Sequence, residues 1–204
     1  RVYNTIIKIL SQHKKWLDVR HKFTLAWMVV GLIRSEKISP TAWIPYVESR
    51  AQYAQSTQRR FHRWLRNHRI NVNELYGPLI QEALAEWGEH TLYLALDTSQ
   101  LFGDYCLIRI SVVSRGRAVP VVWTVLEHKS SAVAYEVYKE LLDNAAKLLP
   151  LGAPVIFLAD RGFADTHLME HVKKLGWHFR IRIKSSFLVN HKGQWRNVNE
   201  IPLE

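Results

Sequence analysis

The hydrophobic spacing of this sequence changes at about Thr91, and that change constrains the fold more than any other feature. From there, apolar side chains alternate with polar or small ones, which is the period-two pattern of a strand with one buried face. Thr91–Asp97 and Tyr105–Ser114 both follow it, and Arg115-Gly116 makes a tight turn into a third run, Ala118–Leu126. Because connections this short join antiparallel neighbours, the pattern predicts three antiparallel strands.

Helical segments separate two further strands. Ser130-Ser131 is expected to cap a helix that runs to about Leu149. The side chains expected to be buried in that helix are Val133, Val137, Leu141 and Leu148. The apolar run Val155–Leu158 predicts a fourth strand, and a helix over 166–175 follows the capping residue Asp165.

The fifth expected strand, Trp177–Lys184, alternates cleanly. The side chains expected to face inward are Trp177, Phe179, Ile181 and Ile183, and those expected outward are His178, Arg180, Arg182 and Lys184. The order βββαβαβ predicts an α/β fold with a mixed sheet and right-handed crossovers. A turn at 190–193 is expected to open a hairpin after this sheet.

Residues 1–90 lack the alternation and are expected to form a helical region before the α/β domain at 91–204. The candidate helices cover 2–17, 22–34, 40–52, 57–68 and, from 71 or 78, the stretch to 87. Two start signals support them, Ser39-Pro40 and the capping-box spacing of Asn71 and Glu74. A hydrophobic content of 48% is enough for a sizeable core.

The charge of the chain points to a polyanionic partner. Its formal net charge is +10, and residues 1–90 hold 14 Lys/Arg against 7 Asp/Glu, whereas 91–204 hold 14 against 11. Such an excess is typical of proteins that bind nucleic acid. The single cysteine, Cys106, excludes an intrachain disulfide and fits a reducing cytosol. No membrane association is expected, because the most apolar run, Phe23–Ile33, is about half the length of a span.

The expected helix at 57–68 carries a basic face. Its apolar stripe, at helical spacing, is predicted to consist of Phe61, Trp64, Leu65 and His68. Arg59, Arg63 and Arg66 fall on the opposite side. Because guanidinium groups bind phosphate and guanine in bidentate fashion, one interpretation is a helix laid on DNA, such as the second helix of a helix-turn-helix. The other is the solvated face of an ordinary amphipathic helix.

Two acidic residues follow apolar runs. Asp97 ends the run from Leu92, and Asp160 follows the run Val155–Leu158 after Ala159. In open α/β sheets, sites lie beyond the carboxyl ends of the strands. Two Asp residues on neighbouring strand ends therefore predict a shared divalent metal. The alternative is that each Asp is a helix cap or a turn residue.

Three stretches carry a resemblance to a known family. They are Leu94–Ser99, Gly116–Trp123 and Leu158–Phe163, and the last contains Asp-Arg-Gly-Phe between a strand and a helix. Together they resemble the DDE transposases of bacterial insertion sequences, in the branch whose later signature is Tyr, Arg, Glu, Lys. The resemblance spans about Thr91 to Lys184 and implies a ribonuclease-H-like fold. The preceding Arg-rich helices also look like the N-terminal region of that group.

The resemblance implies that Asp97 and Asp160 are catalytic and hold Mg²⁺ or Mn²⁺. Two such ions, roughly 3.5 to 4 Å apart, would serve phosphodiester hydrolysis and strand transfer at insertion-sequence ends. The family's third carboxylate is a Glu on a helix after the fifth strand, and neither Glu200 nor Glu204 lies in such a motif. We therefore expect it beyond residue 204, which makes the domain incomplete at its C-terminus. Glu136, on the first crossover helix, is a second candidate for this carboxylate.

The implied partner is double-stranded DNA, at the element ends and at the target, and a homodimer on that DNA is compatible with the resemblance. The implied location is the bacterial cytoplasm, at the nucleoid, and no small-molecule cofactor is expected. Four cations are expected at the DNA: Arg161, Arg180, Arg182 and Lys184. Alternatively, Arg161 neutralises Asp160, and the other three protect an edge strand from aggregation.

Two alternatives remain open at this point. A chain that lacks the third carboxylate is a catalytically inactive DNA-binding remnant. A separate motif, His167-Leu168-Met169-Glu170-His171, spells the H-x-x-E-H pattern of inverzincin zinc proteases, although the sequence indicates no third ligand.

Overall fold

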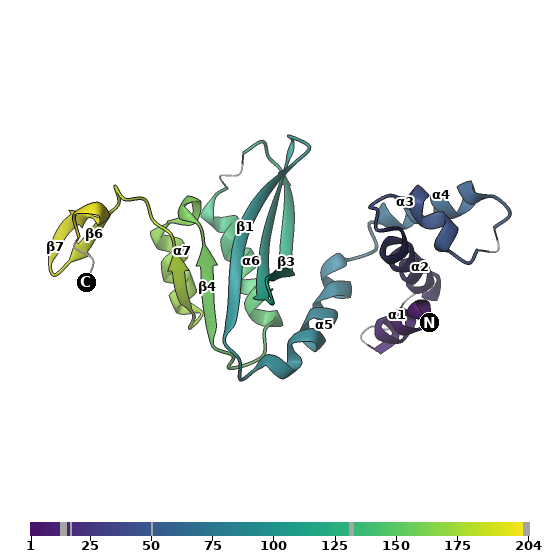
Figure 1. Ribbon diagram of the computed structural model, residues 1–204, viewed down its shortest axis with the longest axis horizontal. Helices are drawn as coiled ribbons and strands as arrows, with labels where there is room; N and C mark the ends of the chain where they lie inside the picture. The colour runs from purple at the N-terminus through teal and green to yellow at the C-terminus, as the bar shows by residue number, and fades with distance from the viewer. Residues whose placement is uncertain (13–15, 17, 50, 131–132, 202–204) are drawn as a thin grey trace. The chain divides into compact units, whose positions relative to one another are not determined.

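The computed structural model describes residues 1–12, 16, 18–49, 51–130 and 133–201. The chain divides into two compact units, Arg1–Leu79 and Ile80–Glu204. The division therefore lies inside a helix, α5 (Val72–Leu84), and not at residue 90. We describe the helical unit and the α/β unit in turn (Figure 1).

The helical unit is built around three packed helices. Its elements before α5 are α1 (Val2–Gln12), α2 (Val19–Ser35), α3 (Pro40–Trp43), the 3₁₀ turn η1 (Ile44–Tyr46) and α4 (Ala54–Leu65). Met28 of α2, Trp43 of α3 and Phe61 of α4 form one buried cluster. At Gly31 of α2 an added Cβ would overlap the Cβ of Trp43, so glycine allows the two helices to approach closely.

Several expected boundaries in this unit are corrected. The helix predicted over 40–52 is wrong, because Pro45 has no N–H to donate to the carbonyl of Thr41, and only η1 follows α3. The predicted end of the first helix at Leu17 lies outside the described residues. The start of α5 is confirmed: the side chain of Asn71 accepts hydrogen bonds from the N–H groups of Asn73 and Glu74.

The α/β unit contains a five-stranded mixed sheet. Its elements are η2 (Ala85–Trp87), β1 (Leu92–Leu101), β2 (Tyr105–Ser114), β3 (Arg117–Glu127), α6 (Tyr135–Leu148), β4 (Val155–Ala159), η3 (Arg161–Phe163), α7 (Thr166–Lys174) and β5 (His178–Ile181). The strand order is β3-β2-β1-β4-β5. The pairs β2–β3 and β1–β2 are antiparallel, and β1–β4 and β4–β5 are parallel. The predicted α/β class and element order are confirmed.

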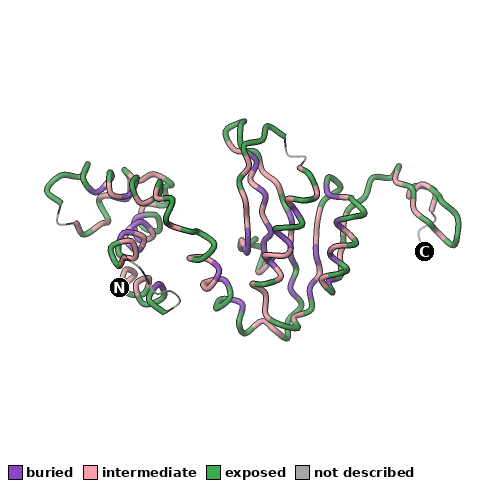
Figure 2. The backbone as a smooth tube through the Cα atoms, turned by 180° about the vertical axis from the view of Figure 1, so that it is seen from behind, coloured by how far each residue is buried: buried purple, intermediate pink, exposed green. Residues whose placement is uncertain are grey.

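One face of the sheet forms the core. α6 contacts β2 and β3, α7 contacts β5, and the two helices contact each other, so they lie on the same face. Alternate residues of β1 and β2 are buried beneath them: Leu92, Leu94, Leu96, Cys106, Ile108, Ile110 and Val112 (Figure 2). The opposite face is partly exposed, with Tyr93 and Val113 each 39% exposed. The predicted alternation of β1 and β2 is confirmed.

The ends of several elements differ from the prediction. β1 continues past Asp97 to Leu101 because it stays paired with β2 as far as Leu101 and Tyr105. α6 begins at Tyr135, and the predicted cap Ser131 lies outside the described residues. Of the four side chains expected to be buried in that helix, only Leu141 is; the others that are buried are Tyr138, Leu142 and Ala145.

The last part of the chain forms the expected hairpin. β5 is an edge strand that ends at Ile181, so Ile183, which is 36% exposed, does not belong to its inward face. β6 (Leu188–His191) and β7 (Gln194–Asn197) then pair as a separate two-stranded sheet. Within the described ranges, no helix combines the length and apolar character needed to cross a membrane.

Candidate active site

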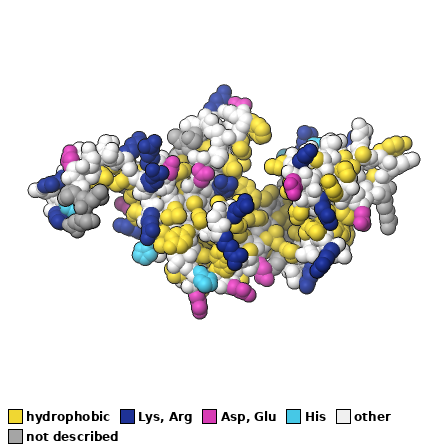
Figure 3. All heavy atoms as spheres, in the orientation of Figure 1, with side chains coloured by type: hydrophobic (Ala, Val, Ile, Leu, Met, Phe, Trp, Pro, Cys, Tyr) yellow, Lys and Arg dark blue, Asp and Glu magenta, His cyan; other side chains and the backbone are white. Residues whose placement is uncertain are grey.

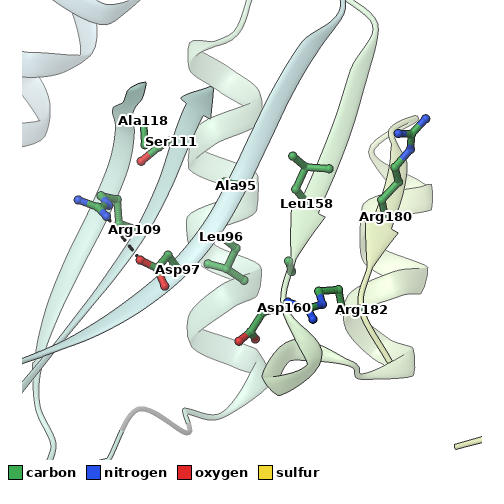
Figure 4. A pocket seen from close by; sticks show the side chains of 11 residues that line it. Ala95, Leu96, Asp97, Arg109, Ser111, Ala118, Leu158, Asp160, Arg180 and Arg182 are labelled. Carbon is green, nitrogen blue, oxygen red and sulfur yellow. Dashed lines mark hydrogen bonds and ion pairs between the residues drawn. The ribbon is translucent and has the colours of Figure 1, made fainter. Parts of the chain in front are cut away.

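The sheet face opposite α6 and α7 contains a groove of about 490 Å³. Asp97 and Asp160 line it, together with three cationic side chains, Arg109, Arg180 and Arg182. Figure 4 shows the two carboxylates toward one end, with Ser111 and Ala118 toward the other. Of the cations expected at DNA, Arg180 and Arg182 thus lie in the groove, whereas Arg161 and Lys184 are exposed and do not line it.

The register of two parallel strands explains why the carboxylates meet. Ala95 of β1 pairs with Leu158 of β4. Extending that register by two residues brings Asp97 level with Asp160, and both side chains then point to the same face as Ala95. β4 ends at Ala159, whereas β1 continues. The side chain of Asp97 therefore lies beside the end of its neighbour, where there is room for a ligand.

Asp97 has one protein partner in the described structure. It lies opposite Arg109 in the antiparallel pair β1–β2, and Arg109 Nη2 is 3.5 Å from Asp97 Oδ2. The Asp97 side chain is 59% exposed, so this ion pair is weak, worth at most about 1 kcal/mol. The carboxylate is held in the groove but remains accessible. Sequence reasoning wrongly placed Asp97 at a strand end; it lies within β1.

Asp160 leaves β4 and caps the short turn η3. Its Oδ1 accepts a hydrogen bond of 2.8 Å from the N–H of Gly162. Asp160 is therefore a capping residue, as one interpretation of the sequence predicted, but the cap occupies only one of its two carboxylate oxygens. Gly162 matters sterically as well, since a Cβ at this position would lie 3.1 Å from Asp160 Oδ1. Among the described residues, Arg161 makes no ion pair with Asp160.

Sequence reasoning missed Arg109 and Ser111. The alternation of 105–114 placed both on the face opposite Cys106 and Ile108, and that was the available signal. What the sequence did not provide is the register with β1, which pairs Arg109 with Asp97 and Ser111 with Ala95.

The donor set of the groove fits Mg²⁺ in the presence of a phosphate substrate. Among the described residues, no group of three or more His, Cys, Asp and Glu side chains could hold a metal ion. The groove thus offers two carboxylates and no more. Mg²⁺ commonly uses one or two protein carboxylates and completes its shell with water and substrate phosphate oxygens. Glu136, the second candidate for a third carboxylate, lies in the first turn of α6 and does not line the groove.

The H-x-x-E-H segment forms α7 and packs against α6. His171 Nε2 lies 2.8 Å from Asp143 Oδ1, and His167 Nδ1 lies 3.6 Å from Asp165 Oδ1. Both imidazole rings pack on Tyr135, with ring centroids 5.9 and 6.2 Å away. Burial, aided by Asp143, raises the pKa of Tyr135. The two His residues therefore take part in the contact between helices.

The basic helix of the first unit is α4. Arg59 and Arg63 are exposed on it, and Arg66, its C-cap, is exposed as well. The predicted apolar stripe is partly wrong: Phe61 is buried and Trp64 partly buried, but Leu65 and His68 are exposed. Thr57 is buried instead, because helical spacing from Phe61 extends toward the N-terminus. Lys and Arg side chains are scattered over the visible face in Figure 3.

The chain was compared with known proteins. No model of a protein family matches it, and no curated protein sequence matches it either.

Proposed function

We propose that this chain is a DDE-type DNA transposase that cuts and joins DNA strands in a metal-dependent reaction. One observation carries the proposal: the register of β1 and β4 brings Asp97 and Asp160 to one end of a groove that also contains Arg109, Arg180 and Arg182. Paired carboxylates next to several guanidinium groups suit a phosphodiester substrate, because they combine cation binding with anion binding.

The topology of the sheet supports the finer assignment, a ribonuclease-H-like fold. In that fold, the first strand carries one catalytic Asp and the end of the fourth strand carries another. Asp97 lies in β1, Asp160 follows β4, and these strands are hydrogen-bonded neighbours. The crossover helix α6 connects β3 to β4, in keeping with the βββαβαβ order.

The roles of the side chains follow from their positions. Asp97 and Asp160 would hold Mg²⁺ or Mn²⁺, which when bound activates an attacking water or 3′-hydroxyl and stabilises the leaving oxygen. Arg182, beside Asp160, is positioned to bind non-bridging phosphate oxygens, and Arg180 lies farther along the same groove (Figure 4). Arg109 forms the weak 3.5 Å ion pair with the Asp97 carboxylate, and its other N–H groups would donate to a substrate phosphate.

The helical unit is proposed to bind the DNA. The exposed side chains of Arg59, Arg63 and Arg66 provide phosphate contacts from one segment of the chain. Double-stranded element ends and target DNA are the proposed partners, with a homodimer as the assembly and the bacterial nucleoid as the place of action. Arg161 and Lys184, which are exposed outside the groove, are proposed as further contacts to the DNA backbone.

A second candidate is a DNA-binding protein without cleavage activity. It is favoured by the count of carboxylates: within the described residues, the groove contains Asp97 and Asp160 but no third acid. Residual cleavage by the chain decides between the two candidates.

The test is Mg²⁺- or Mn²⁺-dependent cleavage of DNA that contains element ends, by the chain and by Asp97→Asn. The carboxamide keeps the size of the side chain but loses its charge, so we expect cleavage to fall by at least about 100-fold. Asp104→Asn is the matched control, because Asp104 is a 63% exposed acid in the turn of the same hairpin. Equal rates for the chain and Asp97→Asn would reject the carboxylate site, and no metal-dependent cleavage at all would favour the DNA-binding candidate.

A further inference from the structure

The groove continues past the carboxylates over a floor of small side chains. Leu158 of β4 pairs with Ala95 of β1, and Ala95 pairs with Ser111 of β2, so these residues form one row across the sheet. Ala118 of β3 also lines this part of the groove. The row lies two residues from Asp97 along β1, about 6.6 to 6.8 Å. At the outer end of the row, Arg180 of β5 pairs with Leu158. One end of the groove thus carries the two carboxylates, and the other combines small and apolar side chains with one guanidinium group.

A bulge in β3 lies next to this floor. The register between β2 and β3 shifts at Ile110 and Ser111, so that Ser111 pairs with Pro120 and Ile110 with Val122. Both Val121 and Val122 are buried as a result. Bulges often occur next to functional sites, where they redirect side chains. Here the bulge lies beside Ser111, and Ala118, which pairs with Val113, is two residues from Pro120 along β3.

Ser111 is the polar exception in the floor. It is 2% exposed, and its hydroxyl has no hydrogen-bond partner among the described residues. A buried hydroxyl without a partner destabilises a protein by about 1 to 3 kcal/mol. Ser111 lines the groove, and rotation about its χ1 bond is the movement by which the hydroxyl would reach a ligand atom there.

We propose that this floor binds the nucleobase next to the phosphate held at Asp97 and Asp160, with the Ser111 hydroxyl as its hydrogen-bond partner. The proposal rests on the proposed function, and it names which part of the substrate each end of the groove takes. Ala95, Ala118 and Leu158 offer hydrocarbon surface, which suits the face of a flat base. Arg180, next to Leu158 in this row, offers a guanidinium plane on which a base can stack.

The test uses a single-stranded trinucleotide of thymidines and a counterpart with an abasic central position. Both are titrated into the full chain with and without Mg²⁺, and binding is read from the NMR amide signals of Ala95, Ser111 and Ala118. These signals report the floor alone, whatever binds to the helical unit. We expect the intact trinucleotide to shift them and to bind about tenfold more tightly than the abasic one.

Two variants give the matched comparison. Ala118→Leu fills the floor from an exposed position and should reduce affinity for the intact trinucleotide to that of the abasic one. Val119→Leu is the control, since Val119 is the next residue of β3, is 41% exposed and does not line the groove. Far-UV circular dichroism and thermal unfolding verify that both variants fold.

Each outcome is decisive. Equal affinity for the two trinucleotides, or unshifted floor signals, overturns the proposal. Equal weakening of both by Ala118→Leu also does so, because the floor would then contact the sugar-phosphate chain. Unshifted floor signals combined with Asp97-dependent cleavage would reject the base site and leave the proposed function standing. Base-dependent shifts without metal-dependent cleavage would do the reverse.

Discussion

Asp160 combines a structural and a proposed catalytic role in one side chain. Its Oδ1 accepts the Gly162 N–H, which fixes the direction of the carboxylate as the chain leaves β4. A fixed carboxylate loses little freedom when it binds a cation, so the cap prepares the ligand. Sequence reasoning treated the cap and the ligand as alternatives, but the geometry is compatible with both.

Gly162→Ala tests this arrangement. The new Cβ would lie 3.1 Å from Asp160 Oδ1, so the carboxylate must move by a few tenths of an ångström. We expect metal-dependent cleavage to fall about tenfold while the free energy of unfolding stays within about 0.5 kcal/mol, since the position is exposed. Steady-state cleavage and urea denaturation measure the two quantities.

The control for this prediction is Gly88→Ala. There the nearest atom to an added Cβ is Pro150 Cβ, at an ordinary 3.8 Å. Unchanged cleavage in Gly162→Ala, with a similar result for Gly88→Ala, would contradict a role for the position of the Asp160 carboxylate.

At the scale of elements, the strands were predictable and their register was not. The alternation of 92–97 and 105–114 identified the buried faces of β1 and β2 correctly, because each strand has one face under helices. Which residues pair across strands depends on the turn over 102–104 and on the bulge at Ile110 and Ser111. The ion pair of Asp97 with Arg109 therefore emerged from the structure alone.

Helix ends were predicted less well than strands. α4 begins at Ala54 and ends at Leu65, so the expected stripe was displaced by about one turn. Tyr138 is the first buried residue of α6, and its hydroxyl accepts a hydrogen bond from the N–H of Val133. That contact closes the turn before the helix, and no sequence pattern indicated it.

Helices α2 and α3 approach each other closely at Gly31 and Trp43. Gly31→Ala places a methyl group onto Trp43, and its Cβ would also lie 3.1 Å from Trp43 Cα. We expect the unfolding free energy of the helical unit to fall by about 1 to 3 kcal/mol, because backbone must shift. Leu32→Ala, at a neighbouring position that is 39% exposed, is the comparison. If urea denaturation finds Gly31→Ala as stable as the parent protein, α3 can move away from α2 without lowering the free energy of unfolding.

The exposed arginines of α4 and of its C-cap are proposed to contact DNA phosphates. If Arg59, Arg63 and Arg66 each contact phosphate, replacing all three by Ala should lower the slope of log affinity against log salt by about three. The control removes three other exposed cations of the same unit, Lys8, Arg34 and Lys37. Fluorescence anisotropy at several salt concentrations gives both slopes. Equal slopes for the two triple variants would indicate a general effect of net charge and not a DNA-binding helix.

For the whole molecule, the two structural units differ more in net charge than residues 1–90 and 91–204 do. Residues 1–79 contain 14 Lys/Arg and 4 Asp/Glu, a net +10, whereas residues 80–204 contain 14 of each and are neutral overall. Placing the boundary at Leu79 thus assigns the whole excess to the helical unit. A neutral α/β unit has little long-range attraction for DNA, so its groove cations act at short range.

This division predicts that binding and cleavage are separable. The Arg59, Arg63 and Arg66 triple variant should weaken DNA affinity but leave the cleavage rate at saturating DNA within about twofold, because effects at independent sites combine additively. Asp97→Asn should do the opposite, with affinity measured in the absence of metal nearly unchanged. Anisotropy and single-turnover cleavage provide the two quantities for each variant. If both quantities fell together in both variants, the two units would form one coupled site, and the charge of the helical unit would have to contribute to the chemistry in the groove.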